Sequence, residues 1–521
     1  MSTDTDVLIV GAGPTGLTAA LEAHAHGASV RIVDRRIERV RRTRAMMLHA
    51  RALECLRPLG VTADLLDRAD TAPRALVHVG RRVVEAGLGH VDLPDTAFPH
   101  LTLVRQADVE EVLWDALRER GVVVEWGIEF LGLQSVPAEE NLVRAALRAV
   151  DGTEELHRCR FVAGCDGQSS TVRRVAGAAW RGAPYRVEAL LADVEVSGDL
   201  DPGVLHVAVG GPGLAFLFAL GEGATWRMLA TRRADPESDA AFGQLGESVP
   251  PGELRRLIEG SRLGATIDEV RWSARVPLQR RVAKPFRRGA LFLAGDAAHA
   301  HSPAGGQGMN NGILDAVNLG WKLGIVSSGS ASELLLESYD QERRRAAREV
   351  LALTRLIFFA EASPNPAARL IRDLVLPATA PLLPGLLRRR RLTAAAIRLL
   401  SQPYVRYRNS SISRDAPPRA SAWPRPGDRL PDQDVVVDGR ATRLHDLTAT
   451  PGIHVLLERD AYWQGDHGAT VTAGQHVNVH RLMSHPGRAA VAARPDGYVG
   501  FRCGVADRRL ADWLSLVGAR T

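Results

Sequence analysis

The segment Asp6–Leu17, DVLIVGAGPTGL, decides the fold that the sequence predicts for the first part of the chain. An apolar run up to Val10 is typical of a buried parallel strand, and the glycine-rich stretch Gly11-Ala12-Gly13-Pro14-Thr15-Gly16 follows at once. A helical pattern then continues to Gly27, and a second strand ends on Asp34, 18 positions beyond Gly16. Strand, glycine turn, helix, strand and acidic residue, in this order, form the complete dinucleotide-binding fingerprint.

The residues of this fingerprint have separate physical roles. Gly11 allows a tight turn, Gly13 lets the backbone meet a pyrophosphate, and Gly16 allows close packing of helix and strand. Asp34 would accept hydrogen bonds from the adenosine ribose. Three neighbouring residues are further candidate cofactor contacts, namely Pro14, Thr15 and Arg35.

The fingerprint does not distinguish FAD from NAD. No second fingerprint follows, because the nearest candidate, Gly211-Pro212-Gly213, has Phe216 where a third glycine is needed. A single site at the very start of the chain fits a tightly held FAD and a nicotinamide, NADPH or NADH, that binds only transiently.

A second glycine-rich segment lies near the middle of the chain. The apolar run 289–294 predicts a buried strand that ends at Gly295, so that Asp296 projects from a strand end, where open α/β sheets bind ligands. The loop SPAGGQGMN at 302–310 follows, and a helical pattern begins at Asn311. Backbone N–H groups and a helix start would meet there and stabilise negative charge, which suits reduced flavin. The candidate contacts are Asp296, Pro303, Gly306, Gly308, Met309 and Asn310. The alternative is a loop that only joins a strand to a helix.

Two further polar residues have two interpretations each. Arg44 lies in a basic segment that leads into a helix, and it is either a contact of the flavin or pyrophosphate or a solvated arginine. Asp166 ends a strand beside Gly167, and it is either a ligand contact or a helix cap, which the pair Ser169-Ser170 also indicates.

The periodicity divides the chain into parts. Between 185 and 276 short strands separated by glycine turns predict an antiparallel sheet, which would form a wall of the substrate cavity. A long helix over 333–359 carries an arginine-rich face at 343–345, and a small α/β unit begins after the prolines at 417–426. We therefore expect an α/β protein with a discontinuous FAD-binding domain (1–75, 100–184 and 277–345), a substrate-binding domain (76–99 and 185–276), a helical connection (346–414) and a C-terminal domain (415–521).

Composition excludes several classes of function. The net charge of +6 comes almost entirely from arginine and has no nucleic-acid motif beside it, so we expect no nucleic-acid partner. The 4 cysteines lack paired or metal-like spacing, which suits a reducing cytosol and predicts no metal site. The polar start predicts no signal peptide, and the lipophilic stretch 374–387 contains three prolines and is too short to span a bilayer. It predicts a packed helical hairpin, although the arginines at 388–391 could touch a membrane surface. We expect a cytoplasmic protein, monomer or homodimer, without integral membrane segments.

The chain resembles the class A, single-component flavoprotein monooxygenases, the para-hydroxybenzoate hydroxylase-like family of FAD-dependent aromatic hydroxylases. Three motifs in the same order carry the resemblance over roughly 300 residues. They are Gly11–Gly16 with Asp34, Cys165-Asp166-Gly167 to Arg173, and Gly295–His299 with Pro303 and Gly305–Asn310.

The resemblance implies roles for particular residues. Asp296 would hold the flavin ribitol, and Asp166 and Arg173 would serve FAD and NAD(P)H binding. Gln106 matches a family glutamine near the cofactor, and Arg44 a family arginine. The C-terminal segment, including 494–499, is similar to the thioredoxin-like domain of the larger members, which lacks redox cysteines as this segment does.

The implied reaction has two halves. NAD(P)H reduces FAD, and O2 then gives a C4a-hydroperoxyflavin that transfers one oxygen atom to an electron-rich ring of a phenolic or polyketide-type substrate, as in secondary metabolism. The same scaffold also allows Baeyer–Villiger or epoxidising oxygenation, or flavin binding without turnover. Halogenation is disfavoured because 272–277, WSARVP, lacks the second tryptophan of that family's motif. No catalytic acid or base is identifiable.

Overall fold

The computed structural model describes residues 4–38, 45–79, 82–87, 89, 93–134, 142–210, 213–222, 224–233, 246–261, 263–302, 304–329, 331–362, 370, 390–402, 404–462, 471–472 and 476–518. Arg44, Pro303 and the stretch 374–387 lie outside these residues, as does the Gly211-Pro212 pair. Within the described ranges, no helix is both long enough and apolar enough to cross a membrane.

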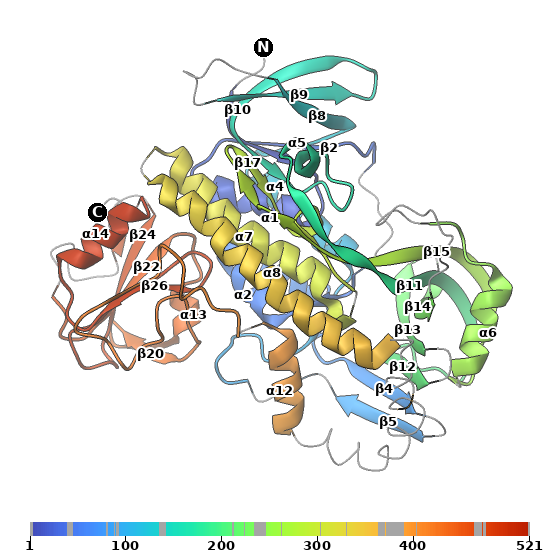
Figure 1. Cartoon of the computed structure of the whole chain (residues 1–521). Helices are drawn as coiled ribbons and strands as arrows, with labels where there is room; N and C mark the ends of the chain where they lie inside the picture. Colours follow the sequence, from blue (N-terminus) through green and yellow to red (C-terminus); the bar gives the residue numbers. More distant parts are fainter. Residues whose placement is uncertain are drawn as a thin grey trace.

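The first sheet lies in the upper part of the molecule in the view of Figure 1. Its parallel core has the order β17-β10-β1-β2-β7, which consists of Leu291–Leu293, Glu154–Gly164, Thr5–Val10, Val30–Asp34 and Val124–Trp126. Antiparallel strands extend it, namely β16 (Arg287–Arg288), β9 (Val143–Ala149) and β8 (Ile128–Gln134). The apolar runs at 6–10 and 289–294 form β1 and β17, which pair with β10 from its two sides. Because all three strands are parallel, their carboxyl ends lie side by side at one edge of the sheet.

Two long helices hold the fingerprint helix in place. Helix α1 (Pro14–Ala25) packs along α7 (Gln307–Ser327), and α8 (Glu333–Ala362) lies alongside α7 (Figure 1). The contact with α1 is close because α7 presents glycines to it: a Cβ atom on Gly320 would lie 2.5 Å from Glu22 Cβ, and one on Gly324 would lie 2.8 Å from the Ala23 carbonyl oxygen. The remaining helices of this part are α2 (Ala50–Leu56), α3 (Thr62–Asp67), α4 (Gln106–Glu119) and α5 (Thr171–Val175).

The second sheet has the order β18-β15-β11-β14-β13-β12-β4-β5. Its strands are His299–Ala300, Ala265–Lys284, Ala179–Gly198, Ala224–Arg233, Gly213–Glu222, Val204–Gly210, Arg74–Val79 and Arg82–Gly87. One face carries a closed core against helix α6 (Pro251–Ser261), with Leu190, Trp226, Leu254 and Ile258 buried.

Two features of this sheet differ from the sequence prediction. The sheet is not purely antiparallel, because β12 pairs with β4 in parallel: the two strands are distant in sequence and no hairpin forces them to alternate. Strands β11 and β15 are also longer than expected. They pair with each other within the second sheet over most of their length, from Ala179 opposite Lys284 to Gly198 opposite Ala265. The register shift between Pro184 and Glu188 falls beside the domain boundary expected at 184/185.

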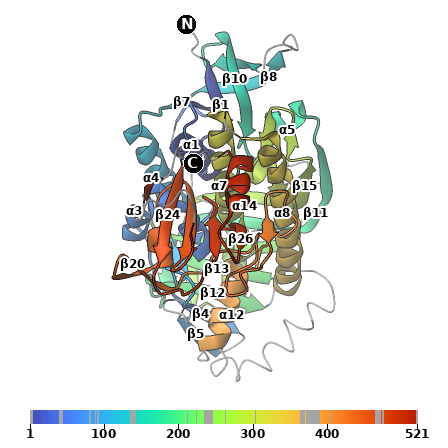
Figure 2. The same ribbon diagram turned by 90° about the vertical axis from the view of Figure 1, so that its left-hand side faces the viewer.

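The C-terminal domain packs on one side of the first sheet and its helices (Figures 1 and 2). Its main sheet has the order β19-β26-β25-β22-β24-β23, from Arg414–Ala416, Val499–Cys503, Ala490–Ala493, Ile453–Glu458, Val477–Leu482 and Val471–Thr472. Hairpin β20 (Asp434–Val437) and β21 (Arg440–Arg443), helix α13 (Leu444–Leu447) and helix α14 (Arg508–Leu516) complete it. Helix α12 (Arg390–Leu400) connects it to the main body. Its likeness to thioredoxin stays a prediction.

Candidate cofactor-binding site

The glycine turn after β1 is built as the fingerprint requires. Gly11 has φ +104°, and a Cβ atom there would lie 2.4 Å from the Cys165 carbonyl oxygen, so that only glycine fits between β1 and β10. A Cβ on Gly16 would lie 1.8 Å from the Gly11 carbonyl oxygen. Gly13 is the N-cap of α1 and caps it with no side chain. The first N–H groups of α1 therefore point from the turn with no capping side chain over them.

Asp34 lies at the end of β2 and closes this turn. Its carboxylate accepts a hydrogen bond from Ala12 N (2.7 Å) and pairs with the Arg36 guanidinium (3.0 Å). Burial disfavours the charged carboxylate, yet Arg36 and the backbone donors hold the pKa of Asp34 below its ordinary value. Arg35, the predicted cofactor contact, is exposed, whereas Arg36 shares the face of Asp34 because residues two apart in an extended chain point the same way.

Thr15 brings the first and third motifs together. A Cβ atom on Gly295 would lie 2.5 Å from Thr15 Oγ1, and one on Gly312 would lie 2.2 Å from the same atom. The start of α1, the end of β17 and the first turns of α7 thus meet at one hydroxyl. Pro14 occupies the first turn of α1 beside it.

Asp296 follows Gly295 in a short 3-10 turn, Gly295–Ala297. It is partly exposed, and its carboxylate has no hydrogen-bond partner among the described residues. A neighbouring carboxylate, Asp315 of α7, is instead fully engaged: it accepts hydrogen bonds from Gly295 N (2.9 Å), His299 Nε2 (2.6 Å) and Arg343 Nε (2.5 Å). Burial disfavours the charge of Asp315, but Arg343 and His299 keep the pKa of this carboxyl below its ordinary value. Asp315 therefore fixes the backbone on which Asp296 stands.

The loop before α7 turns on two left-handed glycines, Gly305 (φ +68°) and Gly306 (φ +63°). The helix begins at Gln307, four residues before the predicted start, so that Gly308, Met309 and Asn310 lie in its first turn and not in a loop. The predicted start was wrong because the first residues of the helix are mostly glycine and polar residues, which do not show the apolar periodicity of a helix. Its N-cap Gly306 supplies no side-chain cap.

The segment before α2 is fastened to this loop. Asn310 Oδ1 accepts from His49 N (2.8 Å), Asn310 Nδ2 donates to the Met47 carbonyl (2.9 Å), and His49 Nε2 donates to the Gly305 carbonyl (2.9 Å). Burial lowers the pKa of His49 to about 4, so that its ring is neutral. The Asn310 side chain thus holds protein backbone and is not available to a ligand.

The middle motif adjoins the third. Asp166 accepts hydrogen bonds from Ser170 Oγ (2.5 Å), Thr171 N (2.6 Å) and Val172 N (3.1 Å), so it caps α5, which is the second of its two interpretations. Arg173 donates to the Ala297 carbonyl (2.9 Å) and lies over the Trp180 ring at 4.0 Å.

Gln106 begins α4, where its backbone N–H donates to the Ala45 carbonyl (2.9 Å) and its side chain to Glu110 (2.7 Å). It therefore lies beside the segment that leads from Arg44.

The residues present fit FAD on structural grounds. Gly11, Gly16 and Gly295 let the three motifs pack closely, because a Cβ on each would meet protein atoms. The two helix starts at Gly13 and Gly306 have no side-chain cap, so no side chain competes there with an anionic ligand. Sequence reasoning missed three supporting residues, namely Arg36, Asp315 and Arg343. The signal for Asp315 was an acidic residue between the apolar residues Ile313-Leu314 and Ala316-Val317.

Comparison with known proteins agrees with this geometry. Residues 4–354 match the family model described as FAD binding domain. Pentachlorophenol 4-monooxygenase of Sphingobium chlorophenolicum is 34% identical over 360 residues, which are 67% of this chain and 64% of that protein, so the chain spans less than two thirds of that relative's length. Anhydrotetracycline monooxygenase of Streptomyces rimosus is 31% identical over 522 residues, 95% of this chain and 94% of that protein. The structure of OxyS anhydrotetracycline hydroxylase from Streptomyces rimosus matches with a TM-score of 0.75 and 28% identity, and the match covers 100% of both chains. The chain therefore belongs to the FAD-binding family of the class A flavoprotein monooxygenases.

Proposed function

We propose that the protein is an FAD-dependent monooxygenase that consumes NADPH or NADH and inserts one atom of O2 into an aromatic substrate. The observation that carries the proposal is the meeting of the first and third motifs at Thr15, Gly295 and Gly312, beside an uncapped start of α7. The middle motif joins them through the hydrogen bond from Arg173 to the Ala297 carbonyl. When bound, FAD would supply the hydride acceptor and the O2-activating group that no side chain provides.

The residues of the chain have distinct tasks in this proposal. The α1 start receives the pyrophosphate, Asp34 the adenosine ribose and Asp296 the ribitol. The N–H groups at the start of α7, at 307–310, stabilise negative charge on the reduced flavin ring. In this proposal the single dinucleotide-binding fingerprint holds FAD. The nicotinamide cofactor binds only transiently, and we assign no residues to its site.

The second sheet supports an aromatic substrate. An apolar row crosses its strands on the face opposite α6, through the paired residues Val207, Phe216, Leu229 and Leu191. Their neighbours Ala215, Leu217 and Met228 point instead into the closed core against α6. Val207, Phe216 and Leu229 keep partial exposure, as the wall of a binding site would. We propose this row as the surface for the rings of a phenolic or polycyclic, polyketide-type substrate, in line with the names of the relatives.

Anaerobic reduction tests the function. The flavin absorbance of the FAD-loaded protein is followed after mixing with NADPH or NADH, with and without simple phenols and polycyclic phenols. We expect one ligand class to accelerate reduction, and oxygen then to give a hydroxylated product by mass spectrometry. Slow reduction with every ligand, and no product, would favour flavin binding without turnover; a lactone or epoxide product would favour the other oxygenations.

A further inference from the structure

The C-terminal domain has no assigned role, and the strongest unexplained feature of the molecule lies where it meets the main body. Nine buried side chains form a connected polar cluster there, which we call the interdomain network: Asp315, Asn318, Lys322, Glu342, Arg343, Tyr407, Arg494, Asp496 and Tyr498. Unpaired buried charge is costly, so a cluster of this size is retained only where its groups satisfy one another.

The loop 494–498 of the C-terminal domain is fixed to α7 and α8. Arg494 pairs with both oxygens of Glu342 on α8 (2.7 and 2.8 Å) and with Asp496 (2.5 Å). Asn318 of α7 donates to Glu342 and to Asp496, each at 2.8 Å. Lys322, one turn later, donates to Glu342 at 2.8 Å. The loop therefore has one position relative to the two helices.

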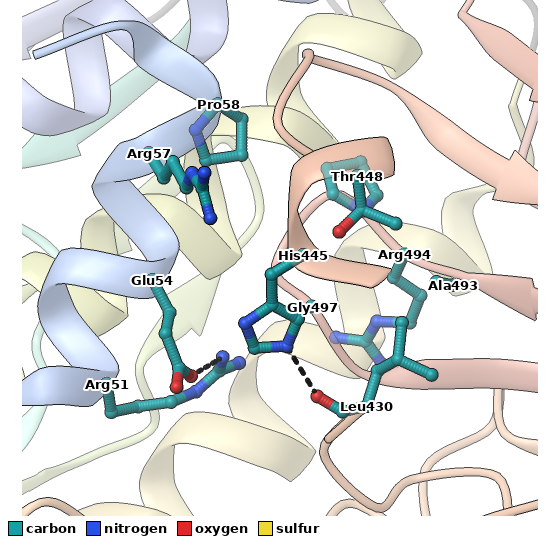
Figure 3. A pocket seen from close by; sticks show the side chains of 11 residues that line it. Arg51, Glu54, Arg57, Pro58, Leu430, His445, Thr448, Ala493, Arg494 and Gly497 are labelled. Atoms are coloured by element: carbon teal, nitrogen blue, oxygen red, sulfur yellow. Dashed lines mark hydrogen bonds and ion pairs between the residues drawn. The ribbon is translucent and has the colours of Figure 1, made fainter. Parts of the chain in front are cut away.

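Helix α2 holds the same loop from the other side. Figure 3 shows the pocket that α2 and the C-terminal domain line together, with Arg51 and Glu54 opposite His445 and Arg494. Arg51 donates to the Asp496 carbonyl, and its guanidinium lies 4.8 Å from the centre of the Tyr498 ring. Tyr498 is thus fixed by contacts from both domains.

Tyr498 in turn packs on Tyr407, which precedes the C-terminal domain. The two ring centres are 4.2 Å apart, and Tyr407 N donates to the Gly427 carbonyl (2.6 Å). The Tyr407 hydroxyl accepts a hydrogen bond from Arg343 Nη1 (2.7 Å), and Arg343 Nε donates to Asp315 (2.5 Å). Since Asp315 holds Gly295 N and His299, four successive contacts join Tyr498 to the backbone beside Asp296.

We propose that Arg343 and Tyr407 are positioning residues, through which the docked C-terminal domain sets the conformation of the Gly295–His299 segment and so the affinity for FAD. This inference rests on the proposed FAD site. In this arrangement the domain needs no redox group. It supplies the Tyr498 ring and the Arg494 guanidinium, which pack on the Tyr407 ring and keep its hydroxyl in hydrogen-bond contact with Arg343. Without that hydrogen bond Arg343 can turn, and Asp315 loses one of the partners that fix it.

The test uses the full-length protein stripped of FAD and titrated with FAD, followed by quenching of flavin fluorescence and by the visible flavin spectrum. Tyr407→Phe removes only the hydroxyl. We expect it to weaken FAD binding about tenfold and to alter the fine structure of the flavin spectrum, because a hydrogen bond from a charged donor is lost. Tyr404→Phe is the matched control: the Tyr404 hydroxyl is buried nearby without a hydrogen-bond partner among the described residues, so binding should not change.

A second pair of variants tests the link to the C-terminal domain. Tyr498→Leu removes the ring that packs on Tyr407, whereas Leu482→Ala creates a cavity inside the core of that domain. We expect Tyr498→Leu to weaken FAD binding and to show non-additivity with Tyr407→Phe, while Leu482→Ala lowers the Tm and leaves FAD binding unchanged.

The outcomes separate the two proposals. Wild-type FAD binding in Tyr407→Phe and Tyr498→Leu would overturn the positioning role while the FAD site stands. Equal weakening by Leu482→Ala would overturn it as well, since general loss of stability would then explain the effect. A wild-type protein that binds no FAD would overturn the proposed function, and the positioning role with it.

Discussion

Single side chains at the site divide into those that remain available to a ligand and those that hold backbone. Asp296 has no hydrogen-bond partner among the described residues, whereas Asp315, Asn310 and Asp166 spend their polar atoms on N–H and C=O groups of the chain. The carboxylates that hold backbone support the candidate site, because each such hydrogen bond restricts the movement of the loop.

At this scale Asp296→Ala tests the ribitol contact. Loss of a charged acceptor should weaken FAD binding roughly tenfold or more, and the purified variant should lose its yellow colour. FAD content per protein, from absorbance, is the measurement. Asp64→Ala, at an exposed position of α3, is the control and should keep its FAD. A fully yellow Asp296→Ala protein would contradict the assignment.

Pairs of elements form the next scale, and the contact of α1 with α7 is the most demanding of them. Glycines of α7 face α1 at intervals of a helical turn, so that the backbones approach closely and the two uncapped helix starts lie together. The sequence shows these glycines, but glycine within a helical pattern indicates only a less stable helix. It does not indicate that another helix packs closely against it.

We therefore expect Gly320→Ala to destabilise the protein. The added Cβ would lie 2.5 Å from Glu22 Cβ and 3.0 Å from the Ala19 carbonyl oxygen, and overpacking of this kind costs about 1–3 kcal/mol. Gly252→Ala in α6, where nothing lies within 4 Å, is the matched helical control and should leave stability unchanged or slightly higher. The Tm by circular dichroism measures both, and equal Tm values would contradict the packing argument.

The second sheet gives a prediction about the substrate. Phe216→Ala removes the aromatic member of the apolar row, and we expect the KM for an aromatic substrate to rise about tenfold, because burial of such a side chain contributes roughly 1.5–3 kcal/mol. Steady-state NAD(P)H consumption measures it. Leu217→Ala changes the adjacent residue on the α6 face, and should lower the Tm while the KM stays the same. The reverse pattern would place the substrate elsewhere.

On the scale of the whole molecule, the C-terminal domain meets the end of α1 through histidines. His26 is fully buried with its ring 5.7 Å from that of His476, and His454 Nδ1 lies 3.0 Å from His480 Nε2. Burial lowers the pKa of His26 and of His454 to about 4. These rings are neutral in the folded protein at pH 7, which lets them pack between the two domains.

A pH dependence of stability follows. Unfolded histidines bind protons near pH 6.5, but His26 and His454 in the folded protein do so only near pH 4. The free energy of unfolding should therefore fall as the pH falls from 6.5 to 4, by up to about 3 kcal/mol for each histidine. Urea unfolding across this range measures the slope. His454→Gln should reduce it, and His24→Gln, at a partly exposed position of α1, should not; an unchanged slope in His454→Gln would contradict the assignment.

The sequence by itself determined most of the local structure around the candidate site. The fingerprint from Val7 to Asp34 and the Gly295-Asp296 segment predicted strands, turns and strand ends correctly, because glycine, apolar and acidic residues constrain the chain over a few positions. The same local reasoning failed for the arginines of the long helix. Residues 343–345 were expected to share one face, yet Arg343 is buried against Asp315 while Arg345 is exposed, since successive residues of a helix lie about 100° apart.

Only the tertiary structure decided which distant groups meet. It placed Asp315 beside Gly295, and Arg494 of the C-terminal domain against Glu342 of α8. Each of these contacts joins a carboxylate to a donor on another element or turn, and the choice of partner depends on how the elements pack and not on the residues alone. The sequence shows which residues carry charge, and the fold determines which of them are buried and pair with each other. The reason is that an unpaired charge is penalised only once the elements have packed and buried it.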